Sequence, residues 1–154
     1  MNYTKPLICA LLVSALSAPV YAAKPSSWGE SDALGGVSKK IDAQQYDAAI
    51  LDLEKIVAKD ADNADAYNLL GFSNRKLKHY EVAEKYYLRA LTLNPKHKGA
   101  MEYLGELYVE TNRLDQAHDM LTRLNEACFF GCKEYRELKA VIEQKEQKLE
   151  VSAN

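Results

Sequence analysis

The sequence predicts an all-α fold: a short right-handed helical-repeat solenoid of antiparallel helix pairs with a C-terminal capping helix. The first observation behind this prediction is that residues 64–97 and 98–131 repeat each other with a period of 34 residues. The second is that apolar residues recur within each unit at helical spacing. The third is a strongly charged segment with a narrow apolar stripe at residues 132–154. Such a segment suits the polar-backed end that stacked repeats need.

The first 22 residues have the pattern of a secretory signal peptide. One basic residue, Lys5, precedes an apolar run from Leu7 to Leu16, and small residues flank Tyr21 before a predicted cleavage after Ala22. The alternatives are a membrane anchor or a buried helix, but the run is only half of the about 20 residues that cross a bilayer. We therefore expect a periplasmic protein without a stable membrane anchor.

The mature chain is mildly acidic. Without Lys5 it has 19 basic and 22 acidic residues, a net charge of −3. It shows no basic patch of the kind that a nucleic-acid backbone requires, so we expect no nucleic-acid partner. Its length suits one domain, which we divide into a repeat domain at residues 23–131 and a cap at residues 132–154.

Three units are in phase, at about residues 30–63, 64–97 and 98–131. The middle unit has two apolar stripes, whose residues are Tyr67, Leu70, Gly71, Asn74, Ala83, Tyr87 and Ala90. The small residues among them let the two helices approach closely, and Asn94-Pro95 ends the second helix. In the first unit Gly35 and Gly36 fall inside the first helix, where each costs about 1 kcal/mol. We therefore expect that helix, near residues 32–42, to be short or frayed.

This pattern resembles the tetratricopeptide repeat. The family's aromatic, Leu, Gly, Ala, aromatic, Ala and Pro fall on Tyr67, Leu70, Gly71, Ala83, Tyr87, Ala90 and Pro95. The third unit is similar at Leu104, Gly105, Tyr108 and Ala117, and it departs at Met101 and Phe129. The resemblance covers roughly residues 30–131. It implies a stack in which the first helix of each unit lines a concave groove that binds a protein or peptide.

By their phase in the repeat, ten residues should line this groove: Asp65, Asn68, Phe72, Arg75, Lys76, Glu102, Tyr103, Glu106, Val109 and Glu110. One unit would present a basic edge and the next an acidic one, which could hold a peptide by charge complementarity, with an aromatic contact at Phe72. The alternative is that these are only exposed helix residues. The family's carboxylate clamp is absent, because its places hold Leu34, Ser38, Leu69, Gly99 and Tyr103.

Two cysteines remain in the mature chain, Cys128 and Cys132. In an exported protein this pair favours a disulfide, with Cα atoms about 6 Å apart, that fixes the angle of the cap. A soft-metal site is an alternative, although a closed zinc site needs four ligands. A redox pair is another, although the spacing has one residue more than the C-x-x-C of thiol oxidoreductases.

The sequence indicates a binding protein rather than an enzyme. It has no Gly-rich phosphate loop, no nucleophile elbow and no histidine pair at ligand spacing, and we expect no cofactor. The leading hypothesis is a periplasmic scaffold for an unidentified envelope protein or peptide. One alternative is a thiol-redox or soft-metal envelope factor that uses Cys128 and Cys132. Another is a structural subunit that forms a homodimer through a poorly covered flank at Ala33, Leu34 and Val37.

Overall fold

The computed structural model describes residues 28–129 and 131–153, with the side chains of 34–129 and 131–152. The predicted signal peptide lies outside this range. The described part of the chain forms seven helices and no strand: α1 (Trp28–Asp42), α2 (Tyr46–Lys59), α3 (Ala64–Lys76), α4 (Tyr80–Leu93), α5 (Lys98–Glu110), α6 (Leu114–Ala127) and α7 (Lys133–Ala153).

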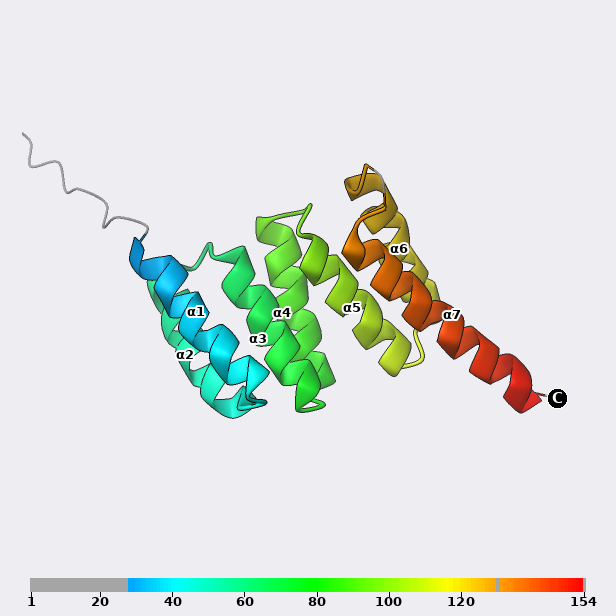
Figure 1. Cartoon of the computed structure of the whole chain (residues 1–154), viewed down its shortest axis with the longest axis horizontal. Helices are drawn as coiled ribbons and strands as arrows, with labels where there is room; N and C mark the ends of the chain where they lie inside the picture. The colour runs from blue at the N-terminus through cyan, green and yellow to red at the C-terminus, as the bar shows by residue number, and fades with distance from the viewer. Residues whose placement is uncertain (1–27, 130, 154) are drawn as a thin grey trace, which may run out of the picture.

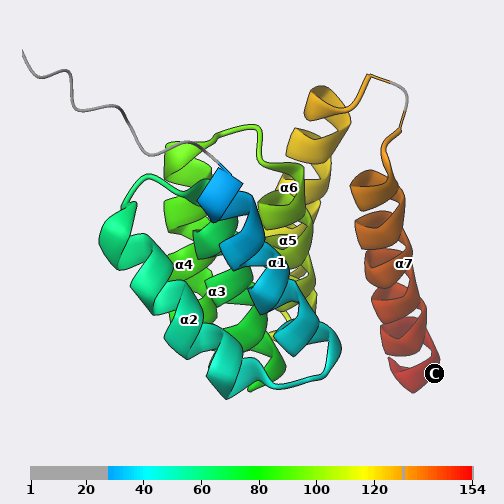
Figure 2. The same cartoon turned by 60° about the vertical axis from the view of Figure 1, so that its left-hand side comes forward.

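The helices form a row of antiparallel pairs, α1–α2, α3–α4 and α5–α6, with α7 at the end opposite to α1 (Figure 1). The turns inside the pairs lie along one edge of the row, at the bottom of the view, and the connections between pairs lie along the opposite edge (Figure 2). Each pair packs on the next, and α7 packs on α5 and α6. The predicted all-α class and the arrangement of consecutive helix pairs are confirmed.

The turn inside each pair repeats the same backbone geometry. The residues Gln44, Lys78 and Asn112 have positive φ angles of 58°, 63° and 59°, and they are spaced by the 34-residue period. In each turn the next N–H donates to a carbonyl five residues earlier: Gln45 to Lys40, His79 to Asn74 and Arg113 to Tyr108, at 2.8, 2.9 and 2.7 Å. This is the pattern of a Schellman motif, which ends the first helix of the pair.

Glycine allows the close contacts that hold the pairs together. A Cβ on Gly71 would lie 2.6 Å from two ring carbons of Tyr87 in the partner helix α4. A Cβ on Gly105 would lie 2.5 Å from a methyl carbon of Leu138 in α7. Tyr87 and Leu138 are both fully buried. The small residues therefore have the role that the sequence predicts in the second pair, and in the third pair the same position receives the cap.

The core consists of two clusters of buried side chains. The smaller one joins α1, α2 and α3 through Val37, Ala49, Leu53, Ala66 and Leu70. The larger one extends from α4 to α7 and includes Ala83, Tyr87, Leu104, Leu124 and Leu138. The side chain of Tyr67 in α3 packs against both clusters, so the core is continuous along the row.

The prediction of a short first helix is wrong, because α1 has 15 residues. Val37 is 1% exposed and packs on α2, with Leu34 and Ile41 partly buried beside it. Packing of this stripe outweighs the low helix propensity of glycine. The flank predicted to mediate self-association is also covered at Leu34 and Val37, and the side chain of Ala33 lies outside the described residues.

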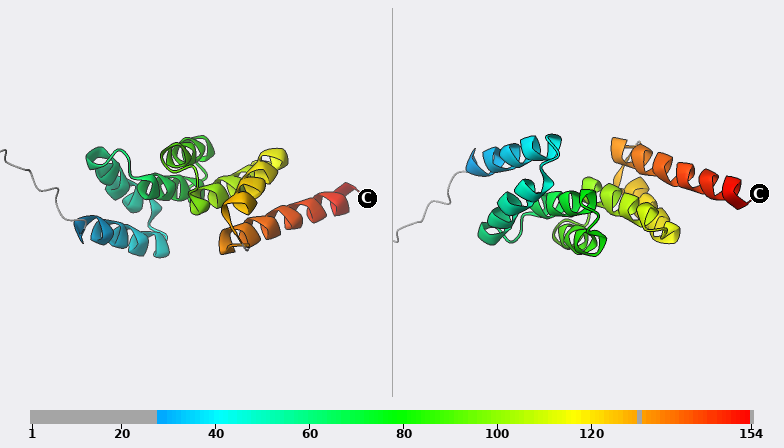
Figure 3. Two further views of the ribbon diagram at one scale, coloured as in Figure 1. Left: turned by 90° about the horizontal axis from the view of Figure 1, so that it is seen from above. Right: turned by 90° about the horizontal axis from the view of Figure 1, so that it is seen from below.

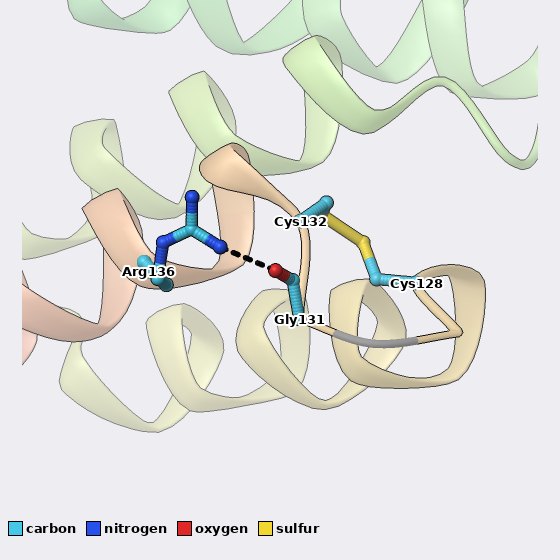
Figure 4. The surroundings of a disulfide bond; sticks show 4 residues. All are labelled: Cys128, Gly131, Cys132 and Arg136. Atoms are coloured by element: carbon cyan, nitrogen blue, oxygen red, sulfur yellow. Dashed lines mark hydrogen bonds between the residues drawn. A yellow bond between two sulfur atoms is a disulfide. The ribbon is translucent and has the colours of Figure 1, made fainter.

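A disulfide joins Cys128, at the end of α6, to Cys132, directly before α7 (Figure 4). Their Cα atoms are 5.5 Å apart, close to the predicted separation. Gly131 lies in the left-handed region with a φ of 70°, and Arg136 in the first turns of α7 donates a hydrogen bond to its carbonyl oxygen. The disulfide and this hydrogen bond together fix how the chain enters the cap.

Candidate peptide-binding surface

The ten residues of the predicted groove lie on α3 and α5, the first helices of the second and third pairs. Side-chain caps fix where both helices begin: Asn63 accepts a hydrogen bond from the Ala66 N–H, and His97 Nδ1 accepts one from the Ala100 N–H. In Figure 3, α1 and α7 lie at the two ends of the molecule, on the same side of α3 and α5. The outer face of α3 and α5 is thus flanked by a helix at each end.

Three aromatic rings from three helices meet on this face. The rings of Phe72 in α3 and Tyr103 in α5 have centroids 5.0 Å apart. The rings of Tyr46 in α2 and Phe72 are arranged edge to face, with centroids 6.4 Å apart. The ammonium group of Lys76 lies 5.1 Å from the centre of the Phe72 ring. All three rings are partly exposed, and Lys76 is exposed. We call Tyr46, Phe72 and Tyr103 the aromatic patch.

Arg75 links the two helices beneath this patch. Its guanidinium lies 2.6 Å from Glu106 and 2.6 Å from Glu110, both on α5, and it is 5.7 Å from the rings of Phe72 and Tyr103. The residue is only 3% exposed. Arg75 of the predicted basic edge is therefore paired inside the molecule with two acids of the predicted acidic edge, and one negative charge of these two acids is left over. Of the predicted basic edge, only Lys76 faces outward.

Asp65 and Asn68 lie where the start of α5 approaches α3. The carboxylate of Asp65 is exposed and lies 2.9 Å from Nε2 of His97, the capping residue of α5. Asn68 is 7% exposed, and its amide nitrogen lies 3.4 Å from the place of a Cβ on Gly99. These two residues contribute to the contact between α3 and α5, and Asp65 also remains on the outer face.

The α5 residues of the predicted groove differ in exposure. Val109 is 5% exposed and belongs to the core, so it does not line the outer face. Glu106 and Tyr103 are partly exposed and Glu110 is exposed. Asp65, Phe72, Lys76, Tyr103, Glu106 and Glu110 therefore remain on the outer face, whereas Asn68, Arg75, Glu102 and Val109 are buried.

Glu102 is a buried acid in the contact between α5 and α7. It is 5% exposed. Burial, the largest cause, acts together with the nearby carboxyl groups of Glu137, Glu106 and Glu134 to raise the pKa of its carboxyl to about 8. Burial disfavours the charged form of an acid, and neighbouring negative charges add to that effect. Glu102 is therefore mainly protonated at neutral pH, unlike an ordinary surface glutamate.

Sequence reasoning missed three residues of this surface. Tyr46 belongs to the second helix of the first unit, and Glu134 and Glu137 belong to the cap. The period of 34 residues assigns each residue to a helix face but does not show which neighbouring helix reaches it. The start of the cap, "CKEYRE", has two acidic and two basic residues, so its composition does not single out Glu134 and Glu137.

Two further features were sought among the described residues, a metal site and a membrane-spanning helix. Among them, no group of three or more His, Cys, Asp or Glu side chains is placed to hold a metal ion. No helix in this part of the chain has the length and apolar character needed to cross a membrane.

Comparison with known proteins agrees with this architecture. Residues 64–97 match the family model of the tetratricopeptide repeat. No curated protein matches the chain by sequence. The Yersinia enterocolitica type III secretion chaperone SycD, solved with a peptide of the translocator YopD, is similar with a TM-score of 0.67 and 13% identity, over 82% of this chain and 95% of SycD.

Two further structures give the same picture. PcrH, solved with the chaperone-binding region of PopD, has a TM-score of 0.69 and 16% identity over 80% of this chain and 96% of PcrH. MamA has a TM-score of 0.57 and 23% identity over 80% of each chain. At such identities the similarity concerns the fold. The chain therefore has the tetratricopeptide-repeat fold, and its residues 64–97 are a tetratricopeptide repeat.

Proposed function

We propose that this protein is a non-catalytic scaffold that binds a peptide or another protein through the outer face of α3 and α5. The observation that carries this proposal is the aromatic patch. Partly exposed aromatic rings from α2, α3 and α5 lie together on that face, with the exposed Lys76 beside them. Aromatic side chains provide a large contact area at little cost in conformational entropy, and they dominate the binding energy of many interfaces.

The contacts beneath the patch support this function because they make the surface rigid. Arg75 ties α3 to α5 through two ion pairs, and its guanidinium is almost fully buried. A surface that is already ordered loses less entropy when a partner binds. The arrangement therefore favours a preformed docking face over one that folds with its partner.

The similar structures support the same function. SycD and PcrH were each solved with a segment of another protein, a peptide of YopD and the chaperone-binding region of PopD. The present chain covers nearly the whole length of both. Binding of a peptide segment is therefore compatible with a chain of this size and fold.

We further propose that the scaffold acts in the periplasm, where its partner would be an envelope protein or peptide. The pattern of residues 1–22 and the disulfide between Cys128 and Cys132 support this location, because disulfides persist mainly in oxidising compartments. Cell fractionation followed by mass spectrometry tests it. The expected product is a periplasmic chain that begins at Ala23, and an intact cytosolic chain would contradict the proposal.

Site-specific photo-crosslinking in cells tests the binding face. We would place a photoreactive amino acid at Lys76 on α3 and, as a matched control, at Lys85, which is exposed on α4. The expected result is a defined crosslinked product from position 76, which Phe72→Ala abolishes, and none from position 85. Equal products from both positions, or a product that Phe72→Ala does not change, would contradict the proposal.

A further inference from the structure

The outer face has an excess of carboxyl groups next to the aromatic patch. Glu102, Glu106 and Glu110 come from α5, and Glu134 and Glu137 come from α7. Leu138, which follows Glu137 in α7, packs on Gly105, which precedes Glu106 in α5, so the acidic side chains of the two helices lie close together. The raised pKa of Glu102 agrees with this arrangement. Two separate helices therefore direct acidic side chains to one region, although like charges disfavour such a contact.

The basic side chains of the described part of the chain do not balance this region. The guanidinium of Arg75 is shared between Glu106 and Glu110. Lys133 lies 3.5 Å from Glu137, but its side chain is 75% exposed, so this ion pair is weak. Glu102 is only 5% exposed, and it forms no ion pair with any of the described basic side chains. Without a cation this carboxyl group is mainly protonated at neutral pH, so the negative charge of the region comes from its more exposed glutamates, Glu106, Glu110, Glu134 and Glu137.

Tyr103 connects the acidic region with the aromatic patch. Its ring packs on Phe72, and it follows Glu102 directly in α5. The guanidinium of Arg75 lies 2.6 Å from Glu106 and 5.7 Å from the ring of Tyr103, so this ring lies close to the Glu106 carboxylate. Burial also raises the pKa of the Tyr103 hydroxyl. An aromatic ring beside carboxylates is the environment that a lysine or arginine side chain prefers, because the cation stacks on the ring while it pairs with the acid.

We infer that the occupant of this face is a basic peptide segment, which places a lysine or arginine against Glu106 and Glu137 and an apolar side chain on the aromatic patch. This inference rests on the proposed function, since it names the chemistry of the partner at the same surface. The cation would supply the positive charge that the acidic region lacks, and the apolar contact would supply most of the buried area.

Fluorescence anisotropy with three labelled peptides tests the inference. Each peptide contains phenylalanine and alanine in alternation with one polar residue, which is arginine in the first peptide, glutamine in the second and glutamate in the third. We expect the arginine peptide to bind at least about tenfold more tightly than the glutamate peptide, with an affinity that falls as salt is raised. Equal affinity of the three peptides, or tighter binding of the glutamate peptide, would overturn the inference.

A pair of charge reversals on α7 tests the position. Glu137 and Glu143 each face a lysine four residues away, at 3.5 and 3.6 Å, and their side chains are 46% and 56% exposed. Only Glu137 lies near Glu102. Glu137→Lys should weaken the affinity for the arginine peptide by about tenfold or more, whereas Glu143→Lys should change this affinity by less than about twofold. Equal effects of the two variants would show that only the net charge of the protein matters, which also overturns the inference.

A third variant separates this inference from the proposed function. If Phe72→Ala abolishes binding of the glutamine or glutamate peptide while the arginine peptide does not bind, the face is a docking site and the inferred charge of its partner is wrong. If Phe72→Ala changes the binding of none of the peptides, the proposed function itself is contradicted. Far-UV circular dichroism of each variant confirms that the helices are retained.

Discussion

Single residues decide how closely the helices of this protein approach one another. Gly71 lies against the ring of Tyr87, whereas no atom of the described residues lies within 4 Å of a Cβ position on Gly35 or Gly36 in α1. The same residue type therefore has opposite effects at these places. In α3 it makes room for a neighbouring ring, and in α1 it only lowers the helix propensity.

Gly71→Ala should destabilise the protein by about 1–3 kcal/mol, even though alanine favours a helix. The added methyl group would lie 2.6 Å from a ring that is fully buried, so the ring or the helix must move. Urea unfolding measures the change. A stability equal to or above that of the wild type would mean that α3 and α4 are less closely packed than the structure shows.

Glu102 should make the stability depend on pH. Its folded pKa of about 8 lies above the ordinary value of 4.5, so between these two values the folded protein holds a proton that the unfolded chain has released. Stability should then fall as the pH rises through this window, with a limiting slope on the order of 1 kcal/mol per pH unit.

Glu102→Gln should remove this dependence, since glutamine does not titrate. Thermal unfolding of both proteins between pH 5 and pH 8 checks the prediction, within the window of the raised pKa. Parallel pH profiles for the two proteins would contradict it. Glu143→Gln, at an exposed position of α7, is the matched control and should keep the profile of the wild type.

At the scale of helices, the first pair shows how packing overrides local preference. The helix α1 packs on α2 through Val37, with Leu34 and Ile41 beside it, although Gly35 and Gly36 lie between them. An ion pair between Lys40 and Asp52 also joins the two helices and lowers the pKa of the Asp52 carboxyl. Tertiary contacts thus form a helix that local propensity alone opposes.

Gly35→Ala/Gly36→Ala should stabilise α1, by up to about 1 kcal/mol for each substitution. Each new methyl group would enter open space, so no packing cost offsets the gain. Hydrogen exchange of the amides in α1 should slow in the double variant. Unchanged or faster exchange would show that the two glycines have a role that their surroundings do not reveal.

The disulfide acts at the same scale, because it joins the end of α6 to the start of α7. Cys128→Ser/Cys132→Ser should lower the stability by roughly 2 kcal/mol on the chain-entropy model, while peptide binding at the α3–α5 face is retained. Thermal unfolding and fluorescence anisotropy measure the two effects. Loss of binding at full stability, or a metal ion bound by the reduced wild type, would instead support a thiol-based function.

The 34-residue period predicted the helices and turns of the second and third pairs, because the same residue types recur at the same places. It also predicted the Gly71 contact, whereas the disulfide was predicted from the spacing of the two cysteines in a chain expected to be exported. It did not predict the charges of the candidate site, because Arg75 finds its partners 31 and 35 residues away, on another helix. Tyr46 and Glu137 were missed for the same reason: their place on the surface depends on how neighbouring pairs are rotated against each other.

At the scale of the whole molecule, the stack combines a rigid body with a chemically distinct outer face. The core extends along the row of helices from α1 to α7. Figure 3 shows that α1 and α7 project to the same side of α3 and α5. The aromatic patch joins α3 and α5, and the acidic region is formed by side chains of α5 and α7. A partner on this face would contact the first helices of successive pairs, so its orientation would follow the axis of the stack.

Backbone chemical-shift changes measured by NMR, on titration with the tightest-binding peptide, test the central claim most directly. We expect the largest chemical-shift changes on the outer face of α3 and α5, at Phe72, Lys76, Tyr103 and Glu106, and also at Glu137 in α7. Changes that concentrate on α4 and α6, or around Cys128 and Cys132, would contradict it.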